Sequence, residues 1–152
     1  MSADGWPYSF RDRIRYGDLD TNAHLNNVAV HQFFESARIA YVRGLFGEID
    51  PMGSAGGFGM IFAETHVRFA SPGFYEEVMR VHVRPEELRR SSVKIAFRMV
   101  CESDGRLVAE GWGTLVGYDY ENSRAAPIPE AVAERLRAAA SRSARSPRSE
   151  PG

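Results

Sequence analysis

The sequence predicts an α+β fold in which a curled antiparallel sheet of about five strands wraps around one long central helix. Apolar residues recur at helical spacing across residues 28–47, and with a period of two through four later segments. Those four segments are joined by short connections, which favour antiparallel neighbours. A sheet with one apolar face needs a cover, and the long helix is the natural one.

The chain begins with one strand, which that helix follows. Residues 10–16 alternate, so Phe10, Ile14 and Tyr16 share the side of a strand that we predict to be half-buried. A polar run at residues 15–27 separates this strand from the helix. The helix should bury the apolar residues that fall near helical spacing, which are Val30, Phe33, Phe34, Ala37, Tyr41 and Leu45.

The remaining strands follow a glycine-rich loop at residues 51–59 and are predicted at residues 60–69, 77–84, 93–101 and 107–119. In the first of these, alternation places Ile61, Val67 and Phe69 on one face and polar residues on the other. In the last, Gly111 and Gly113 indicate close packing or a bulge.

A short helix is predicted after the last strand, within residues 127–140, where Pro129 can begin it. We find no internal repeat and no second domain. The sequence therefore predicts a single domain over residues 1–140, followed by a disordered tail at residues 141–152.

The composition is that of an ordinary globular domain. The 152 residues are 43% hydrophobic and 26% charged, with a net charge of −1. This balance gives no basic field for nucleic acid or an anionic membrane. The single cysteine, Cys101, excludes a disulfide within the chain and fits a reducing compartment. The first residues show no secretory signal and no apolar run approaches the roughly 18 residues of a membrane span, so we expect a cytoplasmic protein.

The polar run before the helix, RYGDLDTNAHLNN, is the candidate for chemistry. Its aspartates and asparagines are also common turn and helix-capping residues, and a purely structural role explains the asparagines well. A helix N-terminus, however, presents free backbone N–H groups that can bind a developing oxyanion. A carboxylate held a few residues earlier, beside such N–H groups, provides the nucleophile or base that acyl transfer needs in addition to the oxyanion donor.

The stretch YGDLDTNAHLNNVAVHQFFESAR resembles the signature of hotdog-fold thioesterases of the 4-hydroxybenzoyl-CoA thioesterase type. In that family an Asp-x-Asp pair ends the first strand, a histidine and asparagines follow, and the helix carries Glu-x-Ala-Arg. Further similarity in the later strands extends the resemblance over about residues 8 to 135. It implies that this chain is an acyl-CoA thioesterase, which hydrolyses an acyl-CoA to a carboxylic acid and free coenzyme A.

The resemblance also assigns roles to residues of the polar run. The family's catalytic carboxylate falls on Asp20, as nucleophile or general base, and its polarising backbone amide falls near Asn27. His24 is a candidate to orient Asp20 or to line the pocket, and Glu35 is a second candidate acid, since some branches carry the acid on the helix. A structural ion-pair network of His31, Glu35 and Arg38 is the alternative for the helix.

Binding of the substrate is assigned in the same way. Basic residues of the family bind the coenzyme A part of the substrate near the position of Arg89, Arg90 and Ser91, although a solvated charged turn explains these residues equally well. No cofactor is implied, and nothing in the sequence has metal-ligand spacing. The resemblance further implies a homodimer or a dimer of dimers with shared sites.

Three alternatives stay open. An acyl-carrier-protein thioesterase would use the same chemistry on a protein partner. A hotdog hydratase or dehydratase carries its histidine five residues after an aspartate, whereas His24 lies six after Asp18. A non-catalytic acyl-binding module would keep the fold without needing Asp20.

Overall fold

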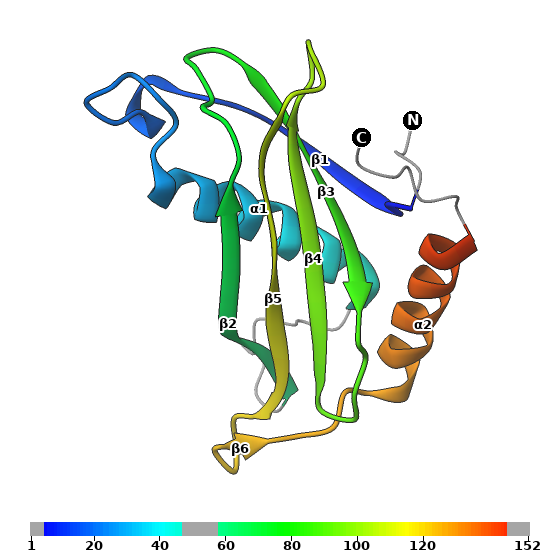
Figure 1. The fold of residues 1–152 in the computed structure, drawn as a ribbon. Coiled ribbons are helices and arrows are strands. Elements are labelled where there is room, and N and C mark those ends of the chain that lie inside the picture. The colour runs from blue at the N-terminus through cyan, green and yellow to red at the C-terminus, as the bar shows by residue number, and fades with distance from the viewer. Residues whose placement is uncertain (1–4, 47–57, 146–152) are drawn as a thin grey trace.

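A computed structural model describes residues 5–46 and 58–145 of the protein (Figure 1). Its strands form one antiparallel sheet in the order β1-β3-β4-β5-β2, with β6 paired to β5, and α1 lies across one face. The predicted fold class is therefore confirmed. The elements are β1 (Tyr8–Arg13), the 3₁₀ turn η1 (Tyr16–Asp18), α1 (Asn27–Phe46), β2 (Phe58–Phe69), β3 (Val78–Glu86), β4 (Ser92–Cys101), β5 (Leu107–Asp119), β6 (Arg124–Ala125) and α2 (Glu130–Arg145).

The core lies between α1 and the sheet, as the two apolar patterns predict. The ring of Phe34 on α1 stacks on Phe97 of β4, with ring centroids 4.1 Å apart. Both side chains are fully buried, which fits a helix that is rich in aromatic residues. The alternating apolar residues of the middle strands are buried with them, namely Met79, Val81, Val83, Val93, Ile95, Met99 and Cys101.

The first strand is shorter than predicted. Ile14 is fully buried as expected, but Tyr16 is 80% exposed, so its predicted place on the buried face is wrong. The chain leaves the sheet after Arg13, and η1 turns Tyr16 outward. A period of two cannot continue through a turn, which explains the error.

A bulge in β2 also overturns part of the predicted pattern. Pairing with β5 shifts register between Phe62 and Glu64, which leaves Ala63 as an extra residue. An extra residue reverses which side chains face the core. Phe62 therefore packs against the core before the bulge and Val67 after it, whereas Ile61 is exposed. The prediction that Ile61 and Val67 share a face is wrong.

The terminal helix is longer than the sequence suggests. α2 runs to Arg145, past residue 140, and packs beside β3 and the end of α1 (Figure 1). Its apolar side chains, Val132, Ala133 and Leu136, join the core. The sheet face thus has a second cover. Residues 146–152 of the predicted tail lie outside the described residues.

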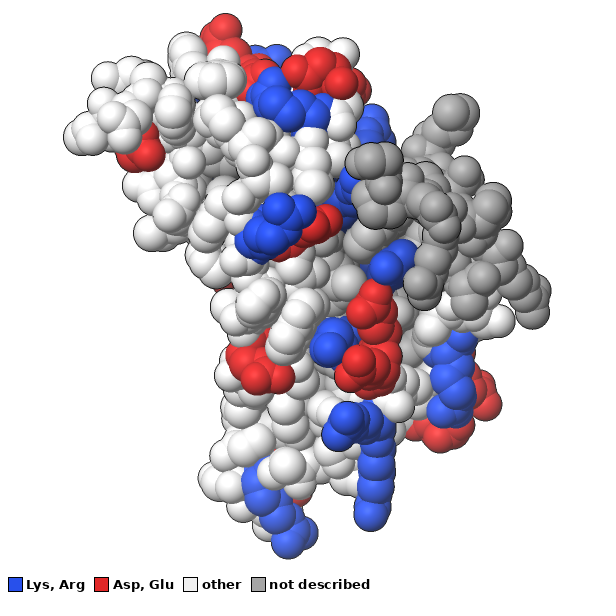
Figure 2. Space-filling model, in the orientation of Figure 1, with Lys and Arg blue, Asp and Glu red and all other residues white. Residues whose placement is uncertain are grey.

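The polar face of the sheet mixes both signs of charge. Figure 2 shows basic and acidic side chains interspersed on one face of the molecule. One such pair joins Arg68 of β2 to Glu110 of β5, at 2.5 Å. His82 on this face is buried beside Trp6, and its burial lowers its pKa, with Arg80 and Arg98 acting in the same direction.

Candidate active site

A short closed loop carries Asp20 between η1 and α1. A backbone bridge pairs Leu19 with Leu25, and the Asn26 N–H donates to the Asp18 carbonyl at 2.8 Å. These contacts close the loop at its base, directly before the first turn of α1. The fold therefore fixes the position of Asp20 relative to the start of the helix.

Asp18, the first acid of the pair, is a structural residue in this loop. Its carboxylate accepts the Arg15 backbone N–H at 2.8 Å and lies 3.4 Å from the Arg15 Nε. The side chain is largely buried, and this geometry holds η1 in place. Asp18 thus behaves as the strand-end carboxylate that turn chemistry predicts.

The Asp20 carboxylate has one oxygen committed to the loop. Oδ1 accepts the backbone N–H of Asn22 at 2.8 Å and that of His24 at 3.2 Å. Oδ2 takes part in none of the hydrogen bonds found among the described residues, and Asp20 is exposed. One oxygen therefore orients the carboxylate and leaves the other available to a ligand.

Ala23 occupies a backbone conformation that favours glycine. Its φ is +60°, in the left-handed region, where a Cβ is crowded by the backbone. Glycine, which has no Cβ, adopts this conformation without that crowding. The tight turn from Asp20 to His24, closed by the Ala23 N–H bond to the Asp20 carbonyl at 3.0 Å, requires this φ.

Replacing this residue tests that strain. We expect Ala23→Gly to raise the free energy of unfolding by about 1 kcal/mol, since glycine relieves the left-handed strain. Thermal unfolding of the two proteins measures the difference. A variant less stable than the parent would contradict the strain that φ at this position implies.

The helix start presents a free amide to the same region. Asn26 caps α1, because its Oδ1 accepts the Val28 N–H at 2.9 Å and its carbonyl accepts the Val30 N–H at 3.1 Å. The Asn27 N–H has no acceptor within the part of the chain that the structure describes. This donor, at the positive end of the helix dipole, is free for a ligand.

Asp20 and Asn27 line one cavity of about 260 Å³. His24 lines it too, with its ring edge-on to Phe74 at 5.4 Å between centroids, but makes no side-chain bond to Asp20. The opposite wall comes from Phe69, at the end of β2, and from the residues that follow it. In the sequence, these last residues are recognisable only as a turn.

Gly73 connects the two walls of the Asp20 cavity. Its carbonyl accepts the Leu25 N–H at 2.8 Å, and an added Cβ would lie 2.8 Å from Ile14 Cδ1. A side chain at this position would force Ile14 or Leu25 to shift, so glycine suits this close approach. The Ser-Pro-Gly turn is the one local signal in the sequence that could have marked the second wall.

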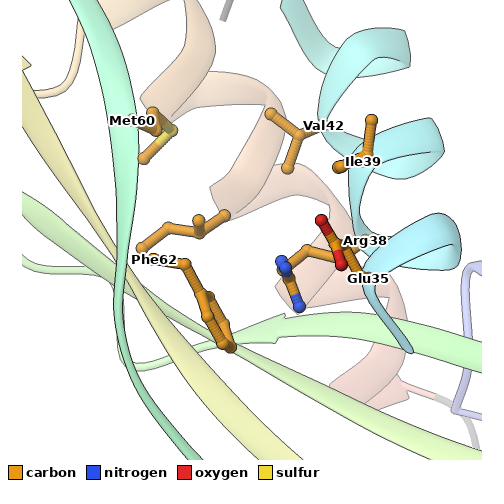
Figure 3. Close-up of a pocket in the computed structure, with 7 residues that line it drawn as sticks. Glu35, Arg38, Ile39, Val42, Met60 and Phe62 are labelled. Carbon is orange, nitrogen blue, oxygen red and sulfur yellow. The ribbon is translucent and has the colours of Figure 1, made fainter. Parts of the chain in front are cut away.

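Glu35 and Arg38 line a different cavity further along α1 (Figure 3). Glu35 lies eight residues after Asn27, which is roughly 12 Å along the helix axis. No ion pair within 4.0 Å involves Glu35, Arg38 or His31 in the described part of the chain. The predicted ion-pair network on this helix is therefore not formed.

Arg89, Arg90 and Ser91 lie at the far end of the sheet from Asp20. They form the turn between β3 and β4, whereas the cavity of Asp20 adjoins the β4–β5 end through Val108. β4 has 10 residues, so roughly 30 Å separate its two ends. The two arginines instead line a cavity of about 400 Å³ beside the start of α2.

One group of potential metal ligands occurs among the described residues. The ligand atoms of Glu77, Cys101 and Asp104 lie within 4.8 Å of one another. Arg106 forms ion pairs of 2.6 Å with both carboxylates, which offsets the charge that would attract a cation. The group lies near the β4–β5 turn and contributes to neither cavity along α1.

A family model described as the thioesterase-like superfamily matches residues 14–136. The chain belongs to this superfamily. A thioesterase of Thermus thermophilus, solved with coenzyme A and Zn, is 32% identical and covers 91% of this chain and 98% of its own, with a TM-score of 0.75.

Two more distant structures share the fold. Slr0204, a 1,4-dihydroxy-2-naphthoyl-CoA thioesterase from Synechocystis, is 12% identical over 85% of this chain and 94% of its own, with a TM-score of 0.77. The hypothetical protein SAV2348 of Staphylococcus aureus, solved in complex with CoA, is 12% identical. The match covers 95% of this chain and 88% of that protein, with a TM-score of 0.83. The predicted hotdog fold is thus confirmed. No helix in residues 5–46 or 58–145 is both long and apolar enough to cross a membrane.

Proposed function

We propose that this thioesterase-like protein is an acyl-CoA thioesterase whose catalytic carboxylate is Asp20. The observation that carries the proposal is the meeting of the Asp20 carboxylate and the free Asn27 N–H in one cavity. The Thermus thermophilus and Staphylococcus aureus relatives were solved with coenzyme A, which supports this carrier as the leaving group.

The reaction needs one base or nucleophile and one oxyanion donor. As general base, Asp20 takes a proton from water while the water oxygen bonds to the thioester carbon. The carbonyl oxygen becomes an oxyanion, and the Asn27 N–H stabilises it at the positive end of α1. The C–S bond then breaks, and the proton passes to the sulfur, which leaves as coenzyme A. As nucleophile, Asp20 would form an anhydride that water hydrolyses to the same products.

These steps require no cofactor and no metal. Thiol release from a panel of acyl-CoA substrates tests the function, with short, long and aromatic acyl groups compared side by side. We expect release well above the buffer rate for at least one class of acyl-CoA. A folded protein that released no thiol from the whole panel would refute the proposal.

A homodimer would bring Arg89 and Arg90 to the site. β2 is an edge strand with mostly exposed side chains, and such an edge is available to pair with another strand. A two-fold axis that pairs β2 with the partner's β2 reverses the strand direction. The partner's β3–β4 turn then lies at the same end of the joined sheet as Asp20. Three strand spacings, or roughly 14 Å, separate the partner's β4 from β2 of this subunit.

Substitution of these arginines tests the assignment. We expect Arg89→Ala with Arg90→Ala to raise KM for acyl-CoA roughly tenfold, because two donors to phosphate are lost. A pantetheine thioester, which lacks the nucleotide phosphates, should lose much less. Equal losses for both substrates would argue against phosphate contact.

Mixed dimers separate a shared site from a site within one subunit. A subunit with Asp20→Asn and one with both arginines replaced are refolded together and assayed. In a shared arrangement, one site of each mixed dimer combines Asp20 with intact arginines of the partner and recovers normal KM. If every mixed dimer keeps the raised KM, the arginines act within their own subunit or not at all.

A further inference from the structure

Arg38 is a buried cation that forms no ion pair with a carboxylate among the residues that the structure describes. It is 7% exposed, and its guanidinium lies 3.7 Å from the ring centroid of Phe62 and 4.9 Å from that of Phe34. Contacts with aromatic faces stabilise a cation, but less than a paired anion does in a desolvated place. Burial lowers the pKa of Arg38 to about 10, while the charge of Glu35 raises it, so Arg38 stays protonated at neutral pH.

The cavity that Arg38 lines is otherwise mostly apolar. It measures about 200 Å³, and its walls include Ile39 and Val42 of α1 and Met60 of β2. Figure 3 shows the guanidinium nitrogen atoms between Phe62 and the carboxylate of Glu35. Glu35 is exposed and forms no ion pair with Arg38, so solvent screens its charge. A mostly apolar pocket with a few convergent polar groups, here the buried Arg38 and the exposed Glu35, is typical of a ligand site.

This cavity lies in line with the cavity of Asp20. α1 and β2 bound both: Asn27 and Phe69 at the catalytic end, Arg38 and Phe62 at the other. His31 sits between the two, with its ring edge-on to Phe69 at 6.4 Å. The guanidinium lies over Phe34, seven residues after Asn27, so roughly 10 Å of helix separates it from the oxyanion donor.

We propose that the Arg38 cavity receives the distal end of the acyl group, and that Arg38 selects acyl groups ending in a carboxylate. The inference rests on the proposed thioesterase function and extends it to a substrate class. An extended acyl chain held at Asn27 by its carbonyl runs along the seam between α1 and β2. Its terminal carboxylate then pairs with the guanidinium of Arg38, which has no ion-pair partner in residues 5–46 and 58–145.

Binding of uncleavable ligands provides the test. The probes are uncleavable ketone analogues of suberyl-CoA, which ends in a carboxylate, and of octanoyl-CoA, which has the same chain length and ends in a methyl group. In both, a methylene group between the sulfur and the carbonyl prevents cleavage and keeps the carbonyl that Asn27 holds. Calorimetry with the full-length protein should give tighter binding of the suberyl analogue. In Arg38→Met its affinity should fall about tenfold or more, and that of the octanoyl analogue much less. Arg38→Lys should retain part of the preference.

The matched control is Arg43→Met, which removes an exposed arginine from the last turn of the same helix and should change neither affinity. Equal affinity of the parent protein for both analogues, or binding of neither, would overturn the inference. A second contradicting outcome is an equal loss of affinity for both analogues in Arg38→Met and in Arg38→Lys, together with dissociation of the oligomer in sedimentation. Arg38 would then serve subunit assembly. Because the analogues are not cleaved, the binding result can be interpreted even if the separate thiol assay shows no thioester hydrolysis.

Discussion

Asp20→Asn should lower kcat for acyl-CoA hydrolysis roughly a thousandfold and leave KM nearly unchanged. The amide keeps the size of the carboxylate and an oxygen that can still accept the N–H groups of Asn22 and His24. The loop should therefore keep its shape, while the group that attacks the thioester or deprotonates water is lost. Steady-state kinetics with free-thiol detection measure both constants.

Glu35→Gln is the matched control for this substitution. It removes a carboxylate from the same seam, but from the cavity that lies roughly two helical turns beyond Asn27. We expect a much smaller change in kcat than for Asp20→Asn. A near-normal kcat in Asp20→Asn together with a large loss in Glu35→Gln would move the catalytic acid to the helix.

Gly111→Ala should cause the largest loss of stability, about 3 kcal/mol. Gly111 of β5 pairs with Val67 of β2, and an added Cβ would lie 1.9 Å from the His66 backbone oxygen. No side-chain rotation relieves a clash with backbone, so β2 must move away from β5. Because β2 forms a wall of both cavities, activity should fall with stability.

Denaturant unfolding and thermal unfolding measure that effect, with a drop in Tm of about 10 °C expected for a domain of this size. Gly44→Ala is the control, since an added Cβ there meets nothing within 4 Å and alanine favours a helix. It should be neutral or slightly stabilising. A Gly111→Ala protein as stable as the parent would show that β2 and β5 do not approach each other so closely at this position.

Asp20 and Asn27 could be predicted from the sequence because they are close along the chain. A loop followed by a helix fixes their relative position locally, and capping and turn chemistry point to the same boundary. The second wall, with Phe69 and Gly73, could not be predicted, because it depends on a strand far along the chain. The one clue was a Ser-Pro-Gly turn, whose glycine matters through its tertiary contact with Ile14.

The alternation in β2 shows where a sequence pattern fails. Residues 60–69 read as one strand with a single phase, but the bulge at Ala63 gives its two halves opposite phases. Arg38 shows a second limit. A charged residue on a helix is expected in solvent, and its burial follows from two aromatic rings, one of them on β2.

The most direct measurement of the central claim is a crystal structure of Asp20→Asn with an uncleaved acyl-CoA bound. The account predicts the thioester carbonyl oxygen within roughly 2.7–3.1 Å of the Asn27 nitrogen, with the thioester carbon beside the side chain of residue 20. A thioester seated in another cavity, or turned so that its carbonyl faces away from the start of α1, would contradict it.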